Sequence, residues 1–181
     1  MKRNAQLTTA LAAISAFSFN AFAIELGNSN GNSDATAQVV WNGFVGNTVE
    51  GSNLIITGIG GGEIGSGTLF VEPDGTFTSS QVVLEAHDFD TDTQTVGERQ
   101  PSASWTYVSS QVMVGGSVTD DADVEVVDAL TNTTLTLGQP DQVQAGVLTL
   151  EIKNTQPLTD VSVEGQAQVS IQMAASYEQA L

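Results

Sequence analysis

Cysteine is absent from the 181-residue chain, and histidine occurs only once, at His87. Without cysteine the chain has no disulfide, no thiolate metal ligand and no thiol nucleophile. A single histidine excludes a zinc site built from several histidines, and it leaves one candidate base for a serine–histidine–aspartate triad. We expect no cofactor and no enzymatic activity, because the groups that acid–base chemistry needs are so scarce.

Basic residues are nearly as scarce, with 4 Lys and Arg against 21 Asp and Glu, for a net charge of −17. Two of the four, Lys2 and Arg3, lie at the N-terminus, and only Arg99 and Lys153 lie further along the chain. Nucleic acids are bound largely by Lys and Arg that neutralise phosphates. The charge therefore excludes a nucleic-acid partner.

Long apolar runs are also missing, and the one at the N-terminus is typical of an export signal. Lys2 and Arg3 precede the apolar stretch 11–19, and the small–x–small sequence 21–23 follows it. A stretch this short does not span a bilayer, which takes about 20 residues. We expect residues 1–23 to be a cleaved signal peptide, and we expect an exported protein that reaches the periplasm and then the cell surface.

A sustained helical period is absent as well, and alternation with a period of two replaces it. Turn residues separate the strand-like runs, among them Pro73-Asp74-Gly75. Many short strands without helices between them predict an all-β fold, an Ig-like antiparallel β-sandwich. We expect a polar leader and a first strand in residues 24–45, and one sandwich domain in residues 46–181. The predicted strands are 54–57, 67–71, 76–86, 104–114, 124–127, 133–137, 147–152 and 163–177.

One glycine pattern resembles a dinucleotide-binding loop. Gly60, Gly62 and Gly65 form G-x-G-x-x-G after an apolar run. Such a loop must lead into a helix whose N-terminus receives the pyrophosphate, whereas these glycines lead into a predicted strand. We therefore interpret the pattern as a glycine-rich loop between strands.

The first and last strands show the clearest alternation. On the first strand, one face carries Ala35, Ala37, Val39, Trp41 and Val45. On the last strand, the apolar face carries Gly165, Ala167, Val169, Ile171, Met173, Ala175 and Tyr177. At about 3.3 Å per residue, the run 163–177 spans roughly 50 Å, which is long for a strand.

This pair of ends resembles the pilin subunits of chaperone–usher pili, in particular the cysteine-free alternate class of colonisation-factor and common-pilus pilins. In that family a glycine and a tyrosine twelve positions later mark the final strand, as Gly165 and Tyr177 do here. The resemblance implies that the sandwich lacks a strand and that a neighbouring subunit donates one. It also implies that Ala35, Ala37, Val39, Trp41 and Val45 are the donor residues. The groove-edge strand would then carry Gly165, Ala167, Val169, Ile171, Met173 and Tyr177.

The partners that the resemblance implies are identical or related pilins, a periplasmic chaperone and an outer-membrane usher. The expected function is that of a structural pilus or fimbrial subunit that supports adhesion or biofilm formation. The alternative is a secreted monomeric β-sandwich that binds a glycan or calcium, with its first strand paired within its own sheet.

Two further groups of residues bear on that alternative. Asp88, Asp90 and Asp92 have the spacing of the first three calcium-loop ligands, but the glycine and the final glutamate of such a loop are missing. We expect a solvated acidic loop and no metal, with these three residues as weak candidates. Trp105 and Tyr107 share one face of a strand, and we expect that face to be core rather than a sugar-binding platform.

Overall fold

The computed structural model describes residues 33–41, 48–49, 53–158 and 166–177. The regular elements of the described chain are β-strands and one short 3₁₀ turn, η1 (Ile59–Gly61). The strands form two sheets whose buried faces share one hydrophobic core, and every strand ladder is antiparallel. The prediction of an antiparallel β-sandwich is confirmed.

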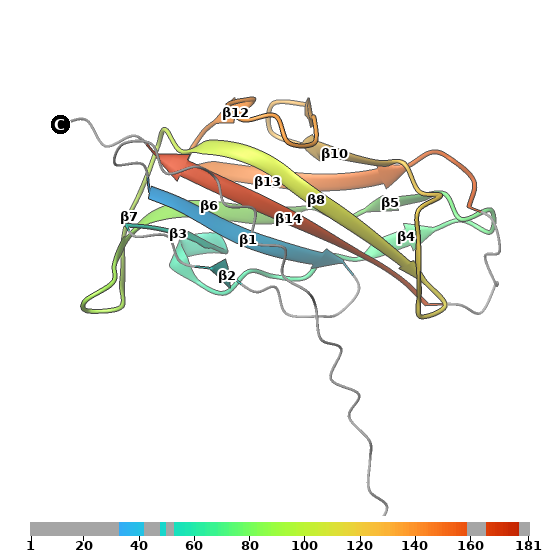
Figure 1. Cartoon of the computed structure of the whole chain (residues 1–181), viewed down its shortest axis with the longest axis horizontal. Coiled ribbons are helices and arrows are strands. Elements are labelled where there is room, and N and C mark those ends of the chain that lie inside the picture. Colours follow the sequence, from blue (N-terminus) through green and yellow to red (C-terminus); the bar gives the residue numbers. More distant parts are fainter. Residues whose placement is uncertain (1–32, 42–47, 50–52, 159–165, 178–181) are drawn as a thin grey trace, which may run out of the picture.

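The first sheet contains the two ends of the described chain (Figure 1). Its strand order is β12-β8-β14-β1-β2, and β9 also pairs with β8. In chain order its strands are β1 (Ser33–Trp41), β2 (Thr48–Val49), β8 (Ser104–Val114), β9 (Ser117–Thr119), β12 (Val143–Gln144) and β14 (Ala167–Tyr177). The first strand and the last strand of the described chain are therefore direct neighbours.

The second sheet has the order β11-β10-β13-β5-β4, with β6 pairing to β13, β3 and β7. Its strands are β3 (Leu54–Thr57), β4 (Leu69–Val71), β5 (Phe77–Ser79), β6 (Val82–Asp90), β7 (Thr95–Arg99), β10 (Val124–Asp128), β11 (Thr133–Leu135) and β13 (Val147–Asn154). β5 and β6 follow one another along the same side of β13.

The core follows from the alternation of the strands, because successive side chains point to opposite faces. From β6, Val82, Leu84 and Ala86 enter the core. From β8, Trp105 and Tyr107 do so, which confirms the prediction that these aromatic residues pack inside. The Trp105 indole N–H donates to the Ala145 carbonyl at 2.7 Å, so its polar atom is satisfied in the interior.

The predicted strands agree with the structure with small differences at their ends. The run 76–86 is two strands, β5 and β6, interrupted at Ser80 and Gln81, and β6 continues to Asp90. The part of the last predicted strand at 163–165 lies outside the described residues. The strands that the sequence did not predict are β2, β7, β9 and β12.

Candidate functional site

The candidate site is the slot that β1 occupies in the first sheet, between β14 on one side and β2 on the other (Figure 1). β1 is antiparallel to β14 over nine residue pairs, from Ser33 opposite Tyr177 to Trp41 opposite Val169. Its pairing with β2 is short and involves only Thr36 and Ala37. β1 is therefore held mainly by β14.

Four of the five residues predicted to fill a groove line the inner face of β1. Ala35, Ala37, Val39 and Trp41 are each at most 1% exposed and belong to the hydrophobic core. Their alternation along an extended strand brings all four to the same face. Val45, the fifth, lies outside the described residues.

The predicted groove-edge residues lie on β14, directly beside β1. Val169, Ile171 and Met173 are fully buried, and Ala167 and Tyr177 are partly buried. In register, Val39 lies opposite Ile171 and Ala37 lies opposite Met173. The sixth predicted residue, Gly165, lies outside the described residues.

The slot is closed at one end by backbone contacts to Trp41 and its neighbour. Gly67 donates its N–H to the Val40 carbonyl at 3.2 Å and forms an isolated parallel bridge with Trp41. The Trp41 indole N–H donates to the Ser80 carbonyl at 3.0 Å. The loop after β3 and the break between β5 and β6 thus both contact the last residues of β1.

Within this structure β1 completes the sheet of its own domain. If β1 left the slot, β14 would become an edge strand with unpaired backbone groups beside an apolar groove. Such an edge pairs readily with an extended strand from another chain. The slot is therefore suited to accept a strand with the inward pattern of β1.

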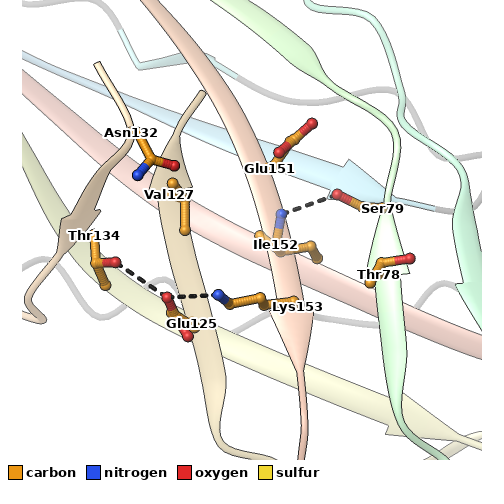
Figure 2. Close-up of a pocket in the computed structure, with 9 residues that line it drawn as sticks. All are labelled: Thr78, Ser79, Glu125, Val127, Asn132, Thr134, Glu151, Ile152 and Lys153. Carbon is orange, nitrogen blue, oxygen red and sulfur yellow. Dashed lines mark hydrogen bonds and ion pairs between the residues drawn. The ribbon is translucent and has the colours of Figure 1, made fainter. Parts of the chain in front are cut away.

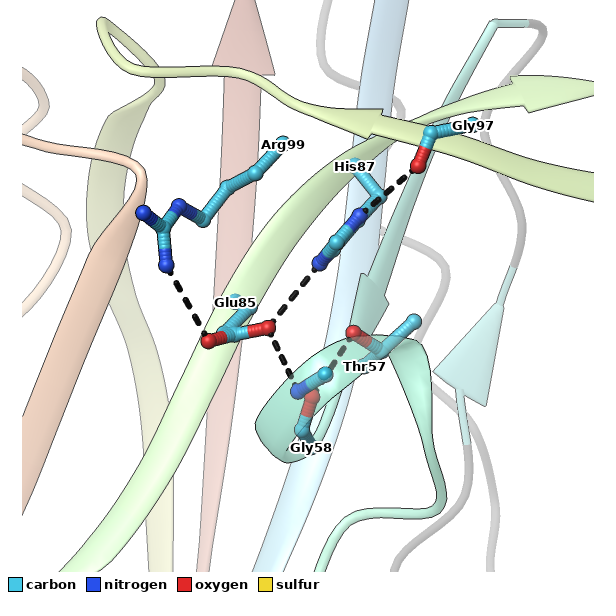
Figure 3. Close-up of polar contacts among 7 residues, drawn as sticks. Thr57, Gly58, Glu85, His87, Gly97 and Arg99 are labelled. Atoms are coloured by element: carbon cyan, nitrogen blue, oxygen red, sulfur yellow. Dashed lines mark hydrogen bonds and ion pairs between the residues drawn. The ribbon is translucent and has the colours of Figure 1, made fainter.

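A second group of side chains lies on the outer face of β6 (Figure 3). Glu85 and His87 are two positions apart and both are buried. One Glu85 oxygen accepts from His87 Nε2 at 3.0 Å and from the Gly60 backbone N–H at 2.8 Å. The other Glu85 oxygen accepts from Arg99 Nη1 at 3.3 Å.

The hydrogen bond from His87 keeps the pKa of Glu85 below its usual value, and the Gly60 N–H and the nearby Arg99 charge act in the same direction against burial. His87 Nδ1 lies 3.0 Å from the Gly97 carbonyl oxygen. Both ring nitrogens of His87 thus lie within hydrogen-bond distance of an oxygen. This arrangement ties the glycine-rich loop to β6 and β7.

The three aspartates with calcium-loop spacing lie at the end of β6 and in the turn that follows. Asp90 accepts backbone N–H groups from Thr93 at 3.0 Å and from Asp92 at 2.9 Å, and hydrogen bonding, chiefly from Thr93, lowers the Asp90 pKa. Asp88 accepts from the Gln100 side chain. Across the described ranges, no group of three or more His, Cys, Asp or Glu side chains is arranged to hold a metal ion.

A shallow pocket of about 320 Å³ lies on the second sheet (Figure 2). Lys153 and Glu125 form an ion pair in it at 2.9 Å, and the Ser79 hydroxyl accepts from the Ile152 N–H at 2.9 Å. The described residues that line it include no aromatic ring on which a sugar could stack. They are Thr78, Ser79, Glu125, Val127, Asn132, Thr134, Glu151, Ile152 and Lys153.

Sequence reasoning missed Glu85, Arg99, Gly60 and Gly67. A local signal existed for Glu85, because a Glu and the only His stand two apart in the otherwise apolar run 82–87. Gly60 and Gly67 carried no local signal, because their partners lie more than twenty positions away in the chain.

No helix among the described residues is both long enough and apolar enough to cross a membrane. Comparison with family models, with curated proteins and with solved structures finds no match.

Proposed function

We propose that this protein is a structural subunit of a surface fibre, a pilus or fimbria, which polymerises when β1 of one copy enters the slot of the next. The observation that carries the proposal is the nine-residue pairing of β1 with β14, with four side chains of β1 fully inside the core. A terminal strand exchanged between identical copies makes the same contacts in the neighbour as in its own domain. A head-to-tail exchange of this kind builds an open fibre.

The energetic weight of β1 supports the proposal. Fully burying a valine side chain contributes about 1.5–3 kcal/mol, and truncating a buried tryptophan typically costs about 3–5 kcal/mol. Val39 and Trp41 alone therefore contribute an amount comparable to the whole net stability of a domain, about 5–15 kcal/mol. A copy whose own β1 has left the slot is then too unstable to persist alone. Such a copy needs a strand from another protein to fill the slot.

The remaining partners follow from that need. Before assembly a periplasmic chaperone would cover the slot, and an outer-membrane usher would bring subunits together at the cell surface. The export-signal pattern in residues 1–23 supports this route. In this proposal the protein is not an enzyme, and fibres of it support adhesion or biofilm formation.

The proposal is tested by removing the donated strand. Deletion of residues 24–45 should abolish fibres, which otherwise run as a ladder on SDS gels that collapses on boiling. Deletion of residues 24–32, which precede β1, is the matched control and should leave the ladder intact. A ladder that persists without residues 24–45 would contradict the assignment of β1 as the donor.

Co-expression keeps the test informative if the deleted chain does not fold alone. A copy without residues 24–45 can accept a strand but cannot donate one, so it should cap growing fibres of the full chain. Fibre length, measured by electron microscopy, should fall as the proportion of deleted copies rises. Unchanged length across all proportions would count against strand exchange. Neighbouring genes for a chaperone and an usher would support the route proposed above.

A second candidate is favoured by the position of β1 within its own sheet in this structure. In that case the protein is a secreted monomer that binds a glycan or calcium, for example at the polar pocket of Figure 2. Size-exclusion chromatography separates the two candidates. A monomer at every concentration, with a melting temperature that depends on calcium or a glycan, supports the second.

A further inference from the structure

The end of the slot at Trp41 differs from the rest of it. Ala35, Ala37 and Val39 are small aliphatic residues that meet the core by apolar contact alone. Trp41, in contrast, is fully buried and also donates its indole N–H to the Ser80 carbonyl. Only this inward position of β1 requires both a large flat ring and a hydrogen-bond donor.

Gly67 provides the space for that ring. A Cβ atom added at Gly67 would lie 2.1 Å from Trp41 Cδ1, 2.3 Å from Trp41 Nε1 and 2.9 Å from Val82 Cγ2. All three distances are shorter than real Cβ contacts, and the ring that would have to move is fully buried. The indole therefore occupies the volume that any side chain at position 67 would need.

The backbone conformation does not explain the glycine at this position. Gly67 is not among the glycines with positive φ, so an L-residue could adopt its backbone angles. Gly67 is buried, and its N–H donates to the Val40 carbonyl. The missing side chain is thus required by the close approach of Trp41 and not by a turn.

We propose that Gly67, together with the Ser80 carbonyl, selects the strand that enters the slot by requiring a tryptophan at its fourth inward position. The partner is a strand with small apolar residues at three alternating positions followed by tryptophan, which is the pattern of β1 itself. The occupant is therefore β1 of a second copy of this chain. This inference rests on the proposed strand exchange.

The physical basis of the selection is twofold. Phenylalanine in place of Trp41 has no N–H, so the part-buried Ser80 carbonyl loses its hydrogen bond. Leucine also leaves a cavity where the indole was, and the cost of a cavity grows with its volume. A site with a buried hydrogen-bonding group discriminates against a partner that lacks the matching group. This discrimination is stronger than a difference in side-chain size alone provides.

The experiment uses the absence of cysteine from the chain. Gln38 and Gln172 are register partners on β1 and β14, and both are half-buried. A donor copy carries Gln38→Cys and an acceptor copy carries Gln172→Cys. Full-length donor and acceptor, distinguished by tags, are refolded together under oxidising conditions. A mixed disulfide dimer forms when the donor's β1 lies in the acceptor's slot.

Trp41→Leu is then placed in either copy. In the donor it should reduce the yield of the mixed dimer about tenfold or more. Truncating a large buried side chain costs more free energy than a tenfold change in an equilibrium constant requires. In the acceptor it should increase the mixed dimer, because the acceptor's own strand competes less well. If the yields of both mixed dimers changed in the same direction, Trp41→Leu would act only by destabilising the fold. That result would overturn the inference.

Gly67→Ala in the acceptor tests the selecting residue itself. The preference for a tryptophan donor over a leucine donor should fall towards one on this acceptor. Gly65→Ala is the matched control, because a Cβ there meets no atom within 4 Å and its φ is not positive. An equal preference on both acceptors would overturn the role of Gly67.

The two proposals fail in different ways. Mixed dimers that form equally with every donor contradict the selection by Gly67 and leave strand exchange standing. No mixed dimer in any pairing contradicts strand exchange. The selection is then measured within one chain that carries both Gln38→Cys and Gln172→Cys, where Trp41→Leu should lower the yield of the internal disulfide. An unchanged yield there would overturn the selection as well.

Discussion

The backbone N–H of Gly60 donates a 2.8 Å hydrogen bond to the carboxylate of Glu85. Glycine-rich loops with exposed N–H groups are suited to bind anions. Here the anion bound by Gly60 is a side chain of the same protein, and the loop continues to Gly67, which pairs with β1. The contact therefore holds the loop that closes one end of the slot.

The first prediction concerns Glu85 itself. Glu85→Gln should lower the free energy of unfolding by about 1–3 kcal/mol at neutral pH, because it weakens hydrogen bonds to a buried ionised group. Urea denaturation measures the change. Glu98→Gln is the charge-matched control, since Glu98 is exposed, and it should have little effect. Equal stability of the two variants would contradict the structural role of Glu85.

The loss of stability caused by Glu85→Gln should depend on pH in a defined direction. The pKa of Glu85 is lowered in the folded state, chiefly by the hydrogen bond from His87. Its stabilising contribution is therefore complete above the unfolded pKa, about 4.3, and is lost as the pH falls through the lower folded pKa. The deficit of Glu85→Gln should be full at pH 7 and should shrink in acid, because a protonated glutamate resembles glutamine. A loss of stability that becomes larger as the pH falls would contradict this prediction.

The second prediction concerns the close approach of Gly67 to Trp41. Gly67→Ala should cost about 1–3 kcal/mol, as overpacking of a filled core does. It should also shift the emission of Trp41, one of two tryptophans in the chain. Gly65→Ala, which has open space around it, should change neither quantity. Thermal or urea unfolding followed by fluorescence distinguishes the two variants.

The third prediction concerns the register between β1 and β14. Val39 and Ile171 are register partners, and both are fully buried. Truncating each to alanine, singly and together, should show a coupling energy of about 0.5–3 kcal/mol, as neighbouring core residues do. Val39 with Leu150, which lies on β13 of the other sheet and is not a register partner, provides the comparison. Coupling no stronger for Ile171 than for Leu150 would argue against this register in solution.

The fourth prediction concerns the aspartates at the β6–β7 turn. Asp90 Oδ1 accepts two backbone N–H groups. The melting temperature of the protein in calcium should therefore be no higher than in EDTA. Asp90→Ala should lower the melting temperature slightly and equally in both buffers, because the turn loses the hydrogen bonds to the Asp90 carboxylate. A rise with calcium that Asp90→Ala abolishes would instead support the calcium-binding candidate. Differential scanning calorimetry in the two buffers makes the comparison.

The sandwich could be predicted because its strands alternate strongly. β8 was predicted with the bounds that the structure shows, because turn residues flank the run, although a register shift within the strand moves the buried face from Trp105 and Tyr107 to Val112. β7 was missed because Thr95–Arg99 is mostly exposed and has no apolar face. Its place is set by backbone pairing with β6, such as His87 with Arg99, and that pairing leaves no periodic apolar pattern.

The candidate site could be predicted only in part. The inward residues of β1 and β14 follow from local alternation, so the sequence identified both strands. It left pairing of the first strand within its own sheet as an alternative, and it did not identify the contact of Gly67 with Trp41, because a non-local contact has no local pattern. Glu85 shows the same limit, since its partner Gly60 lies on a different element.

The neighbouring positions of β1 and β14 also have a consequence for the order of folding. Almost the whole described chain separates the two strands, so β1 is made first and its partner last. Pairing of such distant segments is slow, because a large loop must close before any contact forms. During synthesis the first strand therefore has a long interval in which another molecule can bind it, and which molecule arrives first decides the product.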